Sequence, residues 1–206
     1  MTRPDKLVFV AGTATEVGKT WWTARVASQL RARGTAVAAR KPAQSGDGGG
    51  RTDSEVLAEA TGEHPDDVCP PQRTYGVAWA PPMAAAELGL APYTVADLVR
   101  ETAWAEGTQV AFVDGVGGPR SPIASDGDNV DLARALAPDL VVLVADAGLG
   151  TINAVRLSVP AFTGFEVVVA LNRYEDAGLA SRNRDLLAGD GYDIVTGAEE
   201  LAQRLA

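Results

Sequence analysis

Apolar residues in this chain gather in short runs, each about the length of one β-strand. The runs predict strands over residues 7–10, 35–40, 110–113, 140–144 and 165–171, with a weaker strand near Ile194. A strand that is solvated on one face alternates apolar and polar residues, whereas a strand covered on both faces is apolar throughout. The run at residues 140–144 is the most continuous, so we expect a central strand of a parallel sheet there.

Between these runs, apolar residues recur at the spacing of helices that bury one face. Trp21, Ala24, Ala27 and Leu30 mark the first helix, and Gly34 supplies its stop. Of the two adjacent tryptophans, Trp21 and Trp22, we expect at least one to pack under the sheet. Further helices are predicted over residues 53–60, 83–88, 95–105, 132–136, 151–159, 179–187 and 198–205.

Strands and helices therefore alternate, which is typical of an α/β fold: a doubly wound, mainly parallel sheet with helices on both faces. The glycine run at residues 46–50 is predicted to be a loop, and residues 62–82, rich in proline and polar residues, to be irregular. No repeat or interdomain linker is visible, so we expect residues 1–206 to form one domain. Ligands of such folds bind beyond the carboxyl ends of the strands.

Composition narrows the function. The formal net charge is −9 and the isoelectric point about 4.6, so we expect neither nucleic acid nor an anionic membrane as a partner. No apolar run approaches the ~20 residues of a membrane span, and no signal-peptide core precedes the first strand, which predicts a cytoplasmic protein. Cys69 is the only cysteine, so neither an intrachain disulfide nor a cysteine metal cluster can form. The only histidine, His64, is predicted to be a solvated loop residue rather than a general base.

The first strand and first helix are joined by Gly12-Thr13-Ala14-Thr15-Glu16-Val17-Gly18-Lys19-Thr20. A strand, a tight glycine loop and a helix are the setting of a phosphate-binding loop, in which backbone N–H groups and the positive helix end surround an anion. Lys19 would reach the β- and γ-phosphates there, and the Thr20 hydroxyl would bind Mg²⁺. Five residues separate Gly12 from Gly18, where the common pattern has four. The alternative is an ordinary strand–helix turn that contains Gly-Lys-Thr.

Three more polar residues are candidates for the same site. Asp114 directly follows an apolar strand, as the acid of a Walker B motif does, and Asp53 opens the second predicted helix. Together with Thr20 they offer the carboxylate and hydroxyl oxygens that Mg²⁺ prefers. Lys41 ends the second strand and would neutralise charge on a transferred phosphoryl group. Each residue also has a plain structural explanation: a turn residue for Asp114, a helix cap for Asp53 (Thr52 being the other candidate cap), and an exposed strand-end lysine for Lys41.

Four motifs, taken together, resemble those of the dethiobiotin synthetase family. The loop at residues 12–20 has the family's five-residue gap, and Lys-Pro-Ala-Gln-Ser-Gly at residues 41–46 is similar to its second motif. Val-Asp-Gly-Val-Gly-Gly at residues 113–118 resembles the family's Val-Glu-Gly-Ala-Gly-Gly, and residues 149–153 match its Leu-Gly-Thr-Ile-Asn. Asn172, after a strand, matches the asparagine that holds adenine. The resemblance runs in order from about residue 7 to residue 172 and implies a P-loop NTPase-like fold that uses ATP and Mg²⁺.

The resemblance implies ATP-dependent closure of a cyclic urea in biotin biosynthesis. In that family, CO₂ adds to one amine of 7,8-diaminononanoate, the carbamate takes the γ-phosphoryl group, and the second amine displaces phosphate. Such a scheme needs positioning and charge neutralisation more than a strong base. The residues implied to be catalytic are Lys19, Lys41, Thr13 and Ser45. Those implied to bind ATP are Thr15, Glu16, Val17, Gly18, Lys19, Thr20 and Asn172, and those implied to bind Mg²⁺ are Thr20, Asp53 and Asp114.

The family's diamine lies at the interface of a homodimer. Its implied contacts in this chain are Thr13, Lys41, Ser45, Gly118, Gly150, Thr151, Ile152 and Asn153. Residues 150–153 open a helix, whose positive end would bind the substrate carboxylate from the partner subunit. The chain has Ala14, Asp114 and Ala154 where the family commonly has aspartate, glutamate and histidine. Two alternatives stay open: a related P-loop enzyme that N-carboxylates or amidates another amine, and a nucleotide-switch ATPase.

Overall fold

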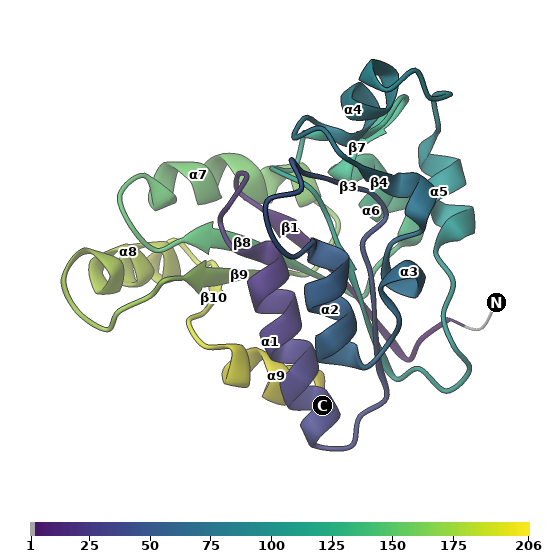
Figure 1. The fold of residues 1–206 in the computed structure, drawn as a ribbon. Coiled ribbons are helices and arrows are strands. Elements are labelled where there is room, and N and C mark those ends of the chain that lie inside the picture. The colour runs from purple at the N-terminus through teal and green to yellow at the C-terminus, as the bar shows by residue number, and fades with distance from the viewer. Residues whose placement is uncertain (1–2) are drawn as a thin grey trace.

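The computed structural model describes residues 3–206 and contains a six-stranded sheet between two layers of helices (Figure 1). The strand order is β10-β9-β8-β1-β5-β2, and every neighbouring pair is parallel. The strands are β1 Lys6–Gly12, β2 Val37–Arg40, β5 Val110–Asp114, β8 Leu140–Asp146, β9 Val167–Asn172 and β10 Asp193–Val195. The predicted doubly wound α/β fold is confirmed.

Helices cover both faces of this sheet. One layer consists of α1 Lys19–Ala32, α2 Asp53–Thr61 and α9 Ala198–Leu205, and the other contains α6 Asn129–Leu136, α7 Thr151–Ser158 and α8 Gly178–Gly189. From β1 the chain runs to the edge strand β2, returns to β5 and then crosses to β8. The carboxyl end of β1 is therefore a point where the strand order reverses, which is where such sheets bind ligands. Among residues 3–206, every helix falls short of the length and apolarity needed to cross a membrane.

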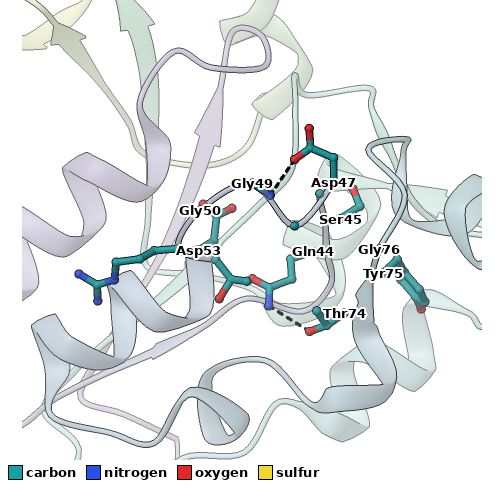
Figure 2. A pocket seen from close by; sticks show the side chains of 13 residues that line it. Gln44, Ser45, Asp47, Gly49, Gly50, Asp53, Thr74, Tyr75 and Gly76 are labelled. Carbon is teal, nitrogen blue, oxygen red and sulfur yellow. Dashed lines mark hydrogen bonds between the residues drawn. The ribbon is translucent and has the colours of Figure 1, made fainter.

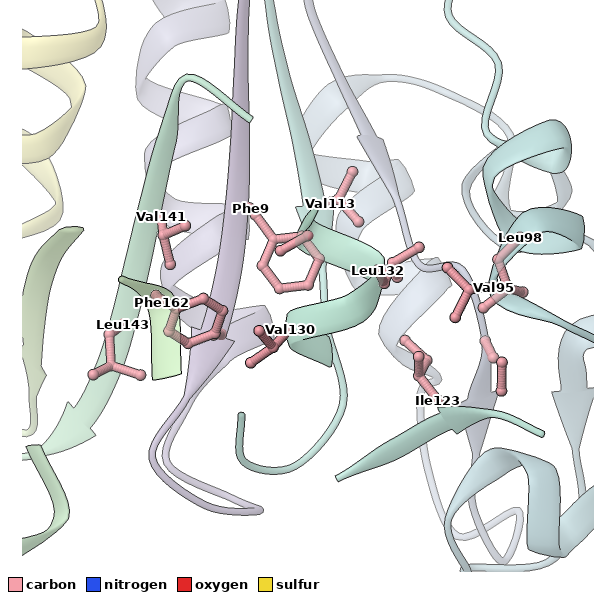
Figure 3. Packing of buried hydrophobic residues seen from close by; sticks show 14 of the residues in the cluster. Phe9, Val95, Leu98, Val113, Ile123, Val130, Leu132, Val141, Leu143 and Phe162 are labelled. Atoms are coloured by element: carbon pink, nitrogen blue, oxygen red, sulfur yellow. The ribbon is translucent and has the colours of Figure 1, made fainter. Parts of the chain in front are cut away.

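Each layer encloses its own apolar core, because successive residues of a buried strand point to opposite faces. Phe9 of β1 packs against Phe162, with ring centroids 6.5 Å apart, in the core beneath α6 and α7 (Figure 3). On the opposite face, Trp22 of α1 lies over the sheet with Phe112 of β5. Trp22 is 2% exposed and its neighbour Trp21 is 52% exposed, so one tryptophan is in the core, as predicted.

The prediction that residues 62–82 are irregular is wrong. This stretch forms α3 Pro65–Val68, the 3₁₀ turn η1 Pro71–Arg73, the strand β4 Thr74–Tyr75 and the start of α4 Pro81–Glu87. Its prolines begin helical turns, where a missing N–H costs nothing, rather than marking loops. The strand β4 pairs in parallel with β3 Gln44–Ser45, a contact between distant segments that local composition does not reveal. A short hairpin of β6 Pro122–Ala124 and β7 Gly127–Asp128 also escaped prediction.

Two helices have boundaries that differ from those predicted. The helix predicted over residues 95–105 is α5 Val95–Glu101, because the chain leaves helical geometry at Thr102 and turns toward Arg40. The Ala103 carbonyl accepts a hydrogen bond from Arg40 Nε at 2.7 Å, and the Arg40 guanidinium lies 4.9 Å from the Trp104 ring centroid. The helix predicted at 132–136 begins instead at Asn129, after a capping box.

A buried leucine in the sheet and an exposed leucine on a helix together test the packing of the core. Leu143 of β8 is fully buried, and Leu143→Ala is expected to lower the free energy of unfolding by about 2–5 kcal/mol, because it leaves a cavity between sheet and helices. Leu157→Ala on α7, where the side chain is 73% exposed, should change it by no more than about 0.5 kcal/mol. Urea unfolding measures both values. Equal effects would contradict the packing described.

Candidate active site

The loop between β1 and α1 is tightly wound, and two glycines make this winding feasible. A Cβ on Gly12 would lie 2.8 Å from the carbonyl oxygen of Ala14. Gly18 has φ of +94°, and a Cβ there would lie 2.1 Å from the Asn172 side-chain nitrogen. Since an L side chain fits neither position, the loop keeps its backbone close to Asn172 and to its own carbonyl groups. The predicted strand–loop–helix arrangement is confirmed.

Contacts from distant strands hold this loop in shape. The Asn172 side-chain amide donates a hydrogen bond to the carbonyl oxygen of Val17 at 2.9 Å, and the Thr13 N–H donates to that of Val144. Arg173 donates to the carbonyl oxygen of Glu16 at 3.1 Å, while the Glu16 side chain is exposed. The carboxyl ends of β8 and β9 thus fix the loop from one side.

Lys19 lies under the loop rather than in solvent. Its ammonium group donates to the carbonyl oxygen of Ala14 at 3.2 Å, and the residue is only 6% exposed. Burial lowers the pKa of Lys19, and the carboxylate of Asp114 opposes this shift. A buried lysine at the amino end of α1 favours an anionic ligand, because a ligand charge would offset the cost of keeping the ammonium ionised.

A compact charged group lies directly behind Lys19, where β2, β5 and α2 meet. Lys41, which is 2% exposed, places its ammonium nitrogen 2.7 Å from Asp53 and 2.9 Å from Asp114. It also donates to the carbonyl oxygen of Gly115 at 2.9 Å. The Thr20 hydroxyl donates to the same carboxyl oxygen of Asp114 at 2.7 Å. Thr20, Lys41, Asp53 and Asp114, far apart in the sequence, form one site; below we call them the charged cluster.

Opposite charges offset the cost of burying the ionised groups of the cluster. Burial by itself lowers the pKa of Lys41, but Asp114 and Asp53 outweigh that effect and raise it above its ordinary value. Burial raises the pKa of Asp114, and the ammonium groups of Lys41 and Lys19 act against this shift. The plain explanations as a turn residue and an exposed strand-end lysine therefore do not describe Asp114 and Lys41, because both are buried in contact with an opposite charge.

Asp53 is available to the cluster because another residue caps its helix. Thr52 is the N-cap of α2, in a capping box with Glu55, which leaves the Asp53 carboxylate to bind Lys41. Burial raises and Lys41 lowers the pKa of Asp53, and the net shift is downward. Gln44 holds the start of α2 in place, since its side-chain amide oxygen accepts a hydrogen bond from the Ser54 N–H at 3.0 Å.

The oxygens of the cluster suit a hard divalent cation. One carboxyl oxygen of Asp114, Oδ1, is buried and, within residues 3–206, has no hydrogen-bond partner. The Asp53 side chain is 42% exposed, and the Thr20 hydroxyl lies beside both carboxylates. Carboxylate and hydroxyl oxygens, with phosphate and water completing the shell, are the donors that Mg²⁺ prefers. The residues present therefore fit this ion.

Asn129 shapes the loop after β5, a role that was not predicted from the sequence. This residue is 1% exposed, and its amide nitrogen donates to the carbonyl oxygens of Val116 and Gly118, while its amide oxygen accepts from the Val116 N–H. A Cβ on Gly118 would lie 3.2 Å from the carbonyl oxygen of Thr13, so this loop rests on the phosphate loop. Only a buried amide with both donors and acceptors can satisfy this backbone, and no motif encodes that.

A cavity of about 250 Å³ opens beside the cluster, between the glycine run at residues 46–50 and β4 (Figure 2). Ser45 and Asp53 line it, and the Ser45 hydroxyl donates to the carbonyl oxygen of Trp79. Figure 2 shows Gln44 bonded to Thr74 at the base of this cavity. Ser45 is thus near the cluster, as the resemblance implied, although its hydroxyl is engaged with the backbone.

A second cavity, of about 430 Å³, lies beside Gly18, at the carboxyl end of β9. Asn172 lines it, as do residues of the first turn of α1 and of the segment before α9. The full set of lining residues is Gly18, Trp21, Trp22, Leu171, Asn172, Arg173, Tyr174, Thr196, Gly197 and Ala198. The part played by Thr196–Ala198 was not predicted, because nothing in that stretch resembles a motif.

Residues 150–153 lie apart from the cluster. Gly150 caps α7 in the left-handed conformation, and Asn153 is exposed. The Thr151 hydroxyl is buried and has no hydrogen-bond partner within residues 3–206. In this part of the chain, no hydrogen bond or ion pair links residues 150–153 to Lys19 or Lys41. The described part of a single chain therefore does not bring every predicted site residue together.

The single histidine and cysteine lie outside these sites. His64 is exposed and caps α3 through a hydrogen bond from the Asp66 N–H. Cys69 is 2% exposed, and burial raises the pKa of its thiol to about 11, so it stays protonated near neutral pH.

Comparisons with known proteins agree with this geometry. A family model described as an AAA domain matches residues 6–189. The chain is 35% identical over 188 residues to the ATP-dependent dethiobiotin synthetase BioD of Corynebacterium efficiens, an alignment that covers 85% of this chain and 80% of the relative. It is 37% identical over 209 residues to the protein of the same name from Rhodococcus jostii, covering 97% of this chain and 89% of that protein.

Solved structures with this fold are more distant in sequence. A duf1611 family protein from Anabaena variabilis has a TM-score of 0.55 at 18% identity, over 99% of this chain and 58% of that one. The Signal Recognition Particle 54 kDa protein from Aeropyrum pernix, in complex with GDP, has a TM-score of 0.51 at 20% identity, over 96% of this chain and 43% of that one. At such identities the likeness is one of fold.

The burial of Lys41 against Asp114 gives a pH-dependent test. Lys41→Met leaves the Asp114 carboxylate buried without its nearest cation, and should lower the free energy of unfolding by about 3–5 kcal/mol near neutral pH. The pKa of Asp114 in the folded variant then lies well above its ordinary value of 3.8. A group whose folded pKa is raised destabilises the protein as pH rises through that pKa. The deficit should therefore be small near pH 4 and grow toward pH 8, measured by urea unfolding.

The control is the double variant Lys41→Met, Asp114→Asn, in which both charges of the buried pair are removed. Its stability relative to the wild type should vary much less over this pH range. A deficit in the single variant that stays constant with pH would contradict the buried ion pair.

Proposed function

The chain belongs to the ATP-dependent dethiobiotin synthetase family and is an ATP-dependent ligase of biotin biosynthesis; from this premise we propose which residues perform each step of ring closure. The observation that carries the proposal is the charged cluster, which lies directly behind a phosphate loop at the carboxyl ends of β1, β2 and β5. Lys41 of this cluster and Lys19 of the loop suit a reaction whose main demand is the neutralisation of moving negative charge.

We assign the nucleotide to the phosphate loop. The N–H groups of Thr15 to Thr20 and the amino end of α1 would surround the phosphates, with Lys19 on the β- and γ-phosphates. The lowered pKa of Lys19 supports this assignment, because bound phosphate would favour its charged form. Asn172, at the cavity beside Gly18, would hold the base.

We assign Mg²⁺ to Thr20, Asp53 and Asp114. The partnerless Oδ1 of Asp114 and the half-exposed carboxylate of Asp53 support this donor set. When bound, the ion supplies positive charge to the phosphate oxygens and orients them. Thr20 and Asp114 are already in contact, so this side of the ion's shell is prepared before the nucleotide arrives.

The chemical steps then depend on Lys19 and Lys41. After CO₂ has added to one amine of 7,8-diaminononanoate, a carbamate oxygen attacks the γ-phosphorus and the bond to ADP breaks. The second amine attacks the carbonyl carbon of this anhydride, the ring closes, and phosphate leaves. Lys19 and Lys41 would balance the charge on the phosphoryl group and carbamate, and Thr13 and Ser45 would donate hydrogen bonds to them. No histidine is needed, which agrees with the remote position of His64.

We further propose that the diamine spans two subunits of a homodimer. Within residues 3–206, Gly118 lies against Thr13 beside the cluster, whereas no hydrogen bond or ion pair joins residues 150–153 to the cluster. In a symmetric dimer the amino end of α7 from the partner would meet the substrate carboxylate. The buried, partnerless hydroxyl of Thr151 supports an anion there. We place the reaction in the cytoplasm, where ATP is available, and assign it to residues 1–206 acting as one domain.

Product formation tests the function as a whole. With Mg-ATP, bicarbonate and 7,8-diaminononanoate, the protein should release phosphate and form a ureido product of the mass of dethiobiotin. Omitting the diamine or Mg²⁺ should reduce phosphate release to background, because the carbamate acceptor or the charge neutralisation is then missing. Nucleotide binding without any stimulation by this diamine would redirect the search to other amines.

Mixing two inactive variants tests the shared site. Lys19→Ala and Asn153→Ala each damage one half of the proposed site, so each alone should be impaired at limiting diamine. A dimer with one subunit of each kind contains one intact site, and random mixing should restore about a quarter of the wild-type activity. Both variants should be mixed after mild unfolding and refolding, with separately refolded variants as the control. No gain on mixing would contradict a site shared between subunits.

A further inference from the structure

The cavity beside Gly18 has a feature that none of the assignments above uses. Trp21, in the first turn of α1, lines it together with Asn172 and Thr196, and this indole is 52% exposed. Because this indole borders the cavity, a planar ligand held there can cover its exposed face and bury apolar surface on both sides.

The Trp21 ring is held in one orientation. The Arg25 guanidinium lies over it, 5.8 Å from the ring centroid, and Trp22 meets it edge-on, with centroids 6.1 Å apart and planes at 77°. Trp22 itself is fixed in the core. A ring that is already oriented loses little conformational entropy when a ligand binds. The free energy gained by contact with the ring is therefore not offset by the cost of ordering it.

The position of this ring relative to the phosphate loop indicates which part of a ligand would contact it. Gly18, whose N–H belongs to the loop, lines the same cavity as Trp21, so a molecule with its phosphates in the loop extends its other end into the cavity. The far side is formed by Thr196–Ala198, and α9 packs beside α1 there (Figure 1). A volume of about 430 Å³ is in the range of small-molecule sites.

Resting on the nucleotide assignment made above, we propose that Trp21 is a base-binding residue, whose indole stacks on the nucleobase of the bound triphosphate. Stacking is suited to this site because hydrogen bonding is limited. One amide hydrogen of Asn172 is already donated to Val17, which leaves the side-chain oxygen and one hydrogen for the base. The aromatic face supplies the remaining affinity, as it does wherever proteins stack bases without reading every edge.

Two ligands separate this role from the function of the loop. Inorganic tripolyphosphate carries the phosphates of ATP but no base, so its affinity depends on the loop alone. In titration calorimetry with Mg²⁺, Trp21→Ala should weaken ATP binding by roughly ten- to a hundredfold. Tripolyphosphate affinity should stay within about twofold of the wild type, and Trp21→Phe should recover most of the ATP affinity. Trp79→Ala, which removes a 49% exposed indole away from this cavity, is the matched control and should leave ATP affinity unchanged.

The possible results distinguish base stacking by Trp21 from phosphate binding by the loop. Unchanged ATP affinity in Trp21→Ala overturns base stacking but leaves the phosphate loop assignment standing. An equal loss of ATP and tripolyphosphate binding also overturns it, because Trp21 would then act by shaping the helix and loop. Failure of the wild type to bind either ligand would overturn the nucleotide assignment itself, and the role of Trp21 with it.

Discussion

An ammonium group lies out of water at the end of β2 and stays charged because carboxylates from two other elements are in contact with it. Lys41 meets Asp114 at the end of β5 and Asp53 at the start of α2, and Thr20 of α1 bonds to the same Asp114 oxygen. Any of these charges left alone in that position would be strongly unfavourable. The contacts among these charges therefore fix β2, β5, α1 and α2 relative to one another. The phosphate loop is positioned with them, because it leads directly into α1.

Two buried asparagines hold the neighbouring glycine loops in fixed conformations through hydrogen bonds to their backbone. Asn172 bonds to the loop before α1, and Asn129 bonds to the loop after β5 through both ends of its amide. The glycines beside them have no Cβ, so backbone and amide approach more closely than another residue would allow. Backbone groups fixed in this way can stabilise charge without first having to reorganise, which is what phosphoryl transfer requires of its site.

Much of this could be read from the sequence, because the strands are apolar runs and the motifs directly follow them. Lys19 was found from the glycine loop before it, and Lys41 and Asp114 from their positions at strand ends, which the parallel sheet brings together. The cap of α2 was undecided from sequence, since Thr52 and Asp53 are both good caps, and only the contact with Lys41 shows what Asp53 does. The elements within residues 62–82 and the amide network of Asn129 depend on contacts between distant segments. Such contacts leave no local pattern.

The bond between Asn172 and Val17 joins residues 155 positions apart. Because synthesis runs from the amino end, the phosphate loop is made well before the strand that fixes its shape. A nascent chain that ends before β9 carries the whole loop motif without the amide that holds it, and contacts of such separation form late in folding. The loop therefore lacks this support until β9 has been made and has paired with β8.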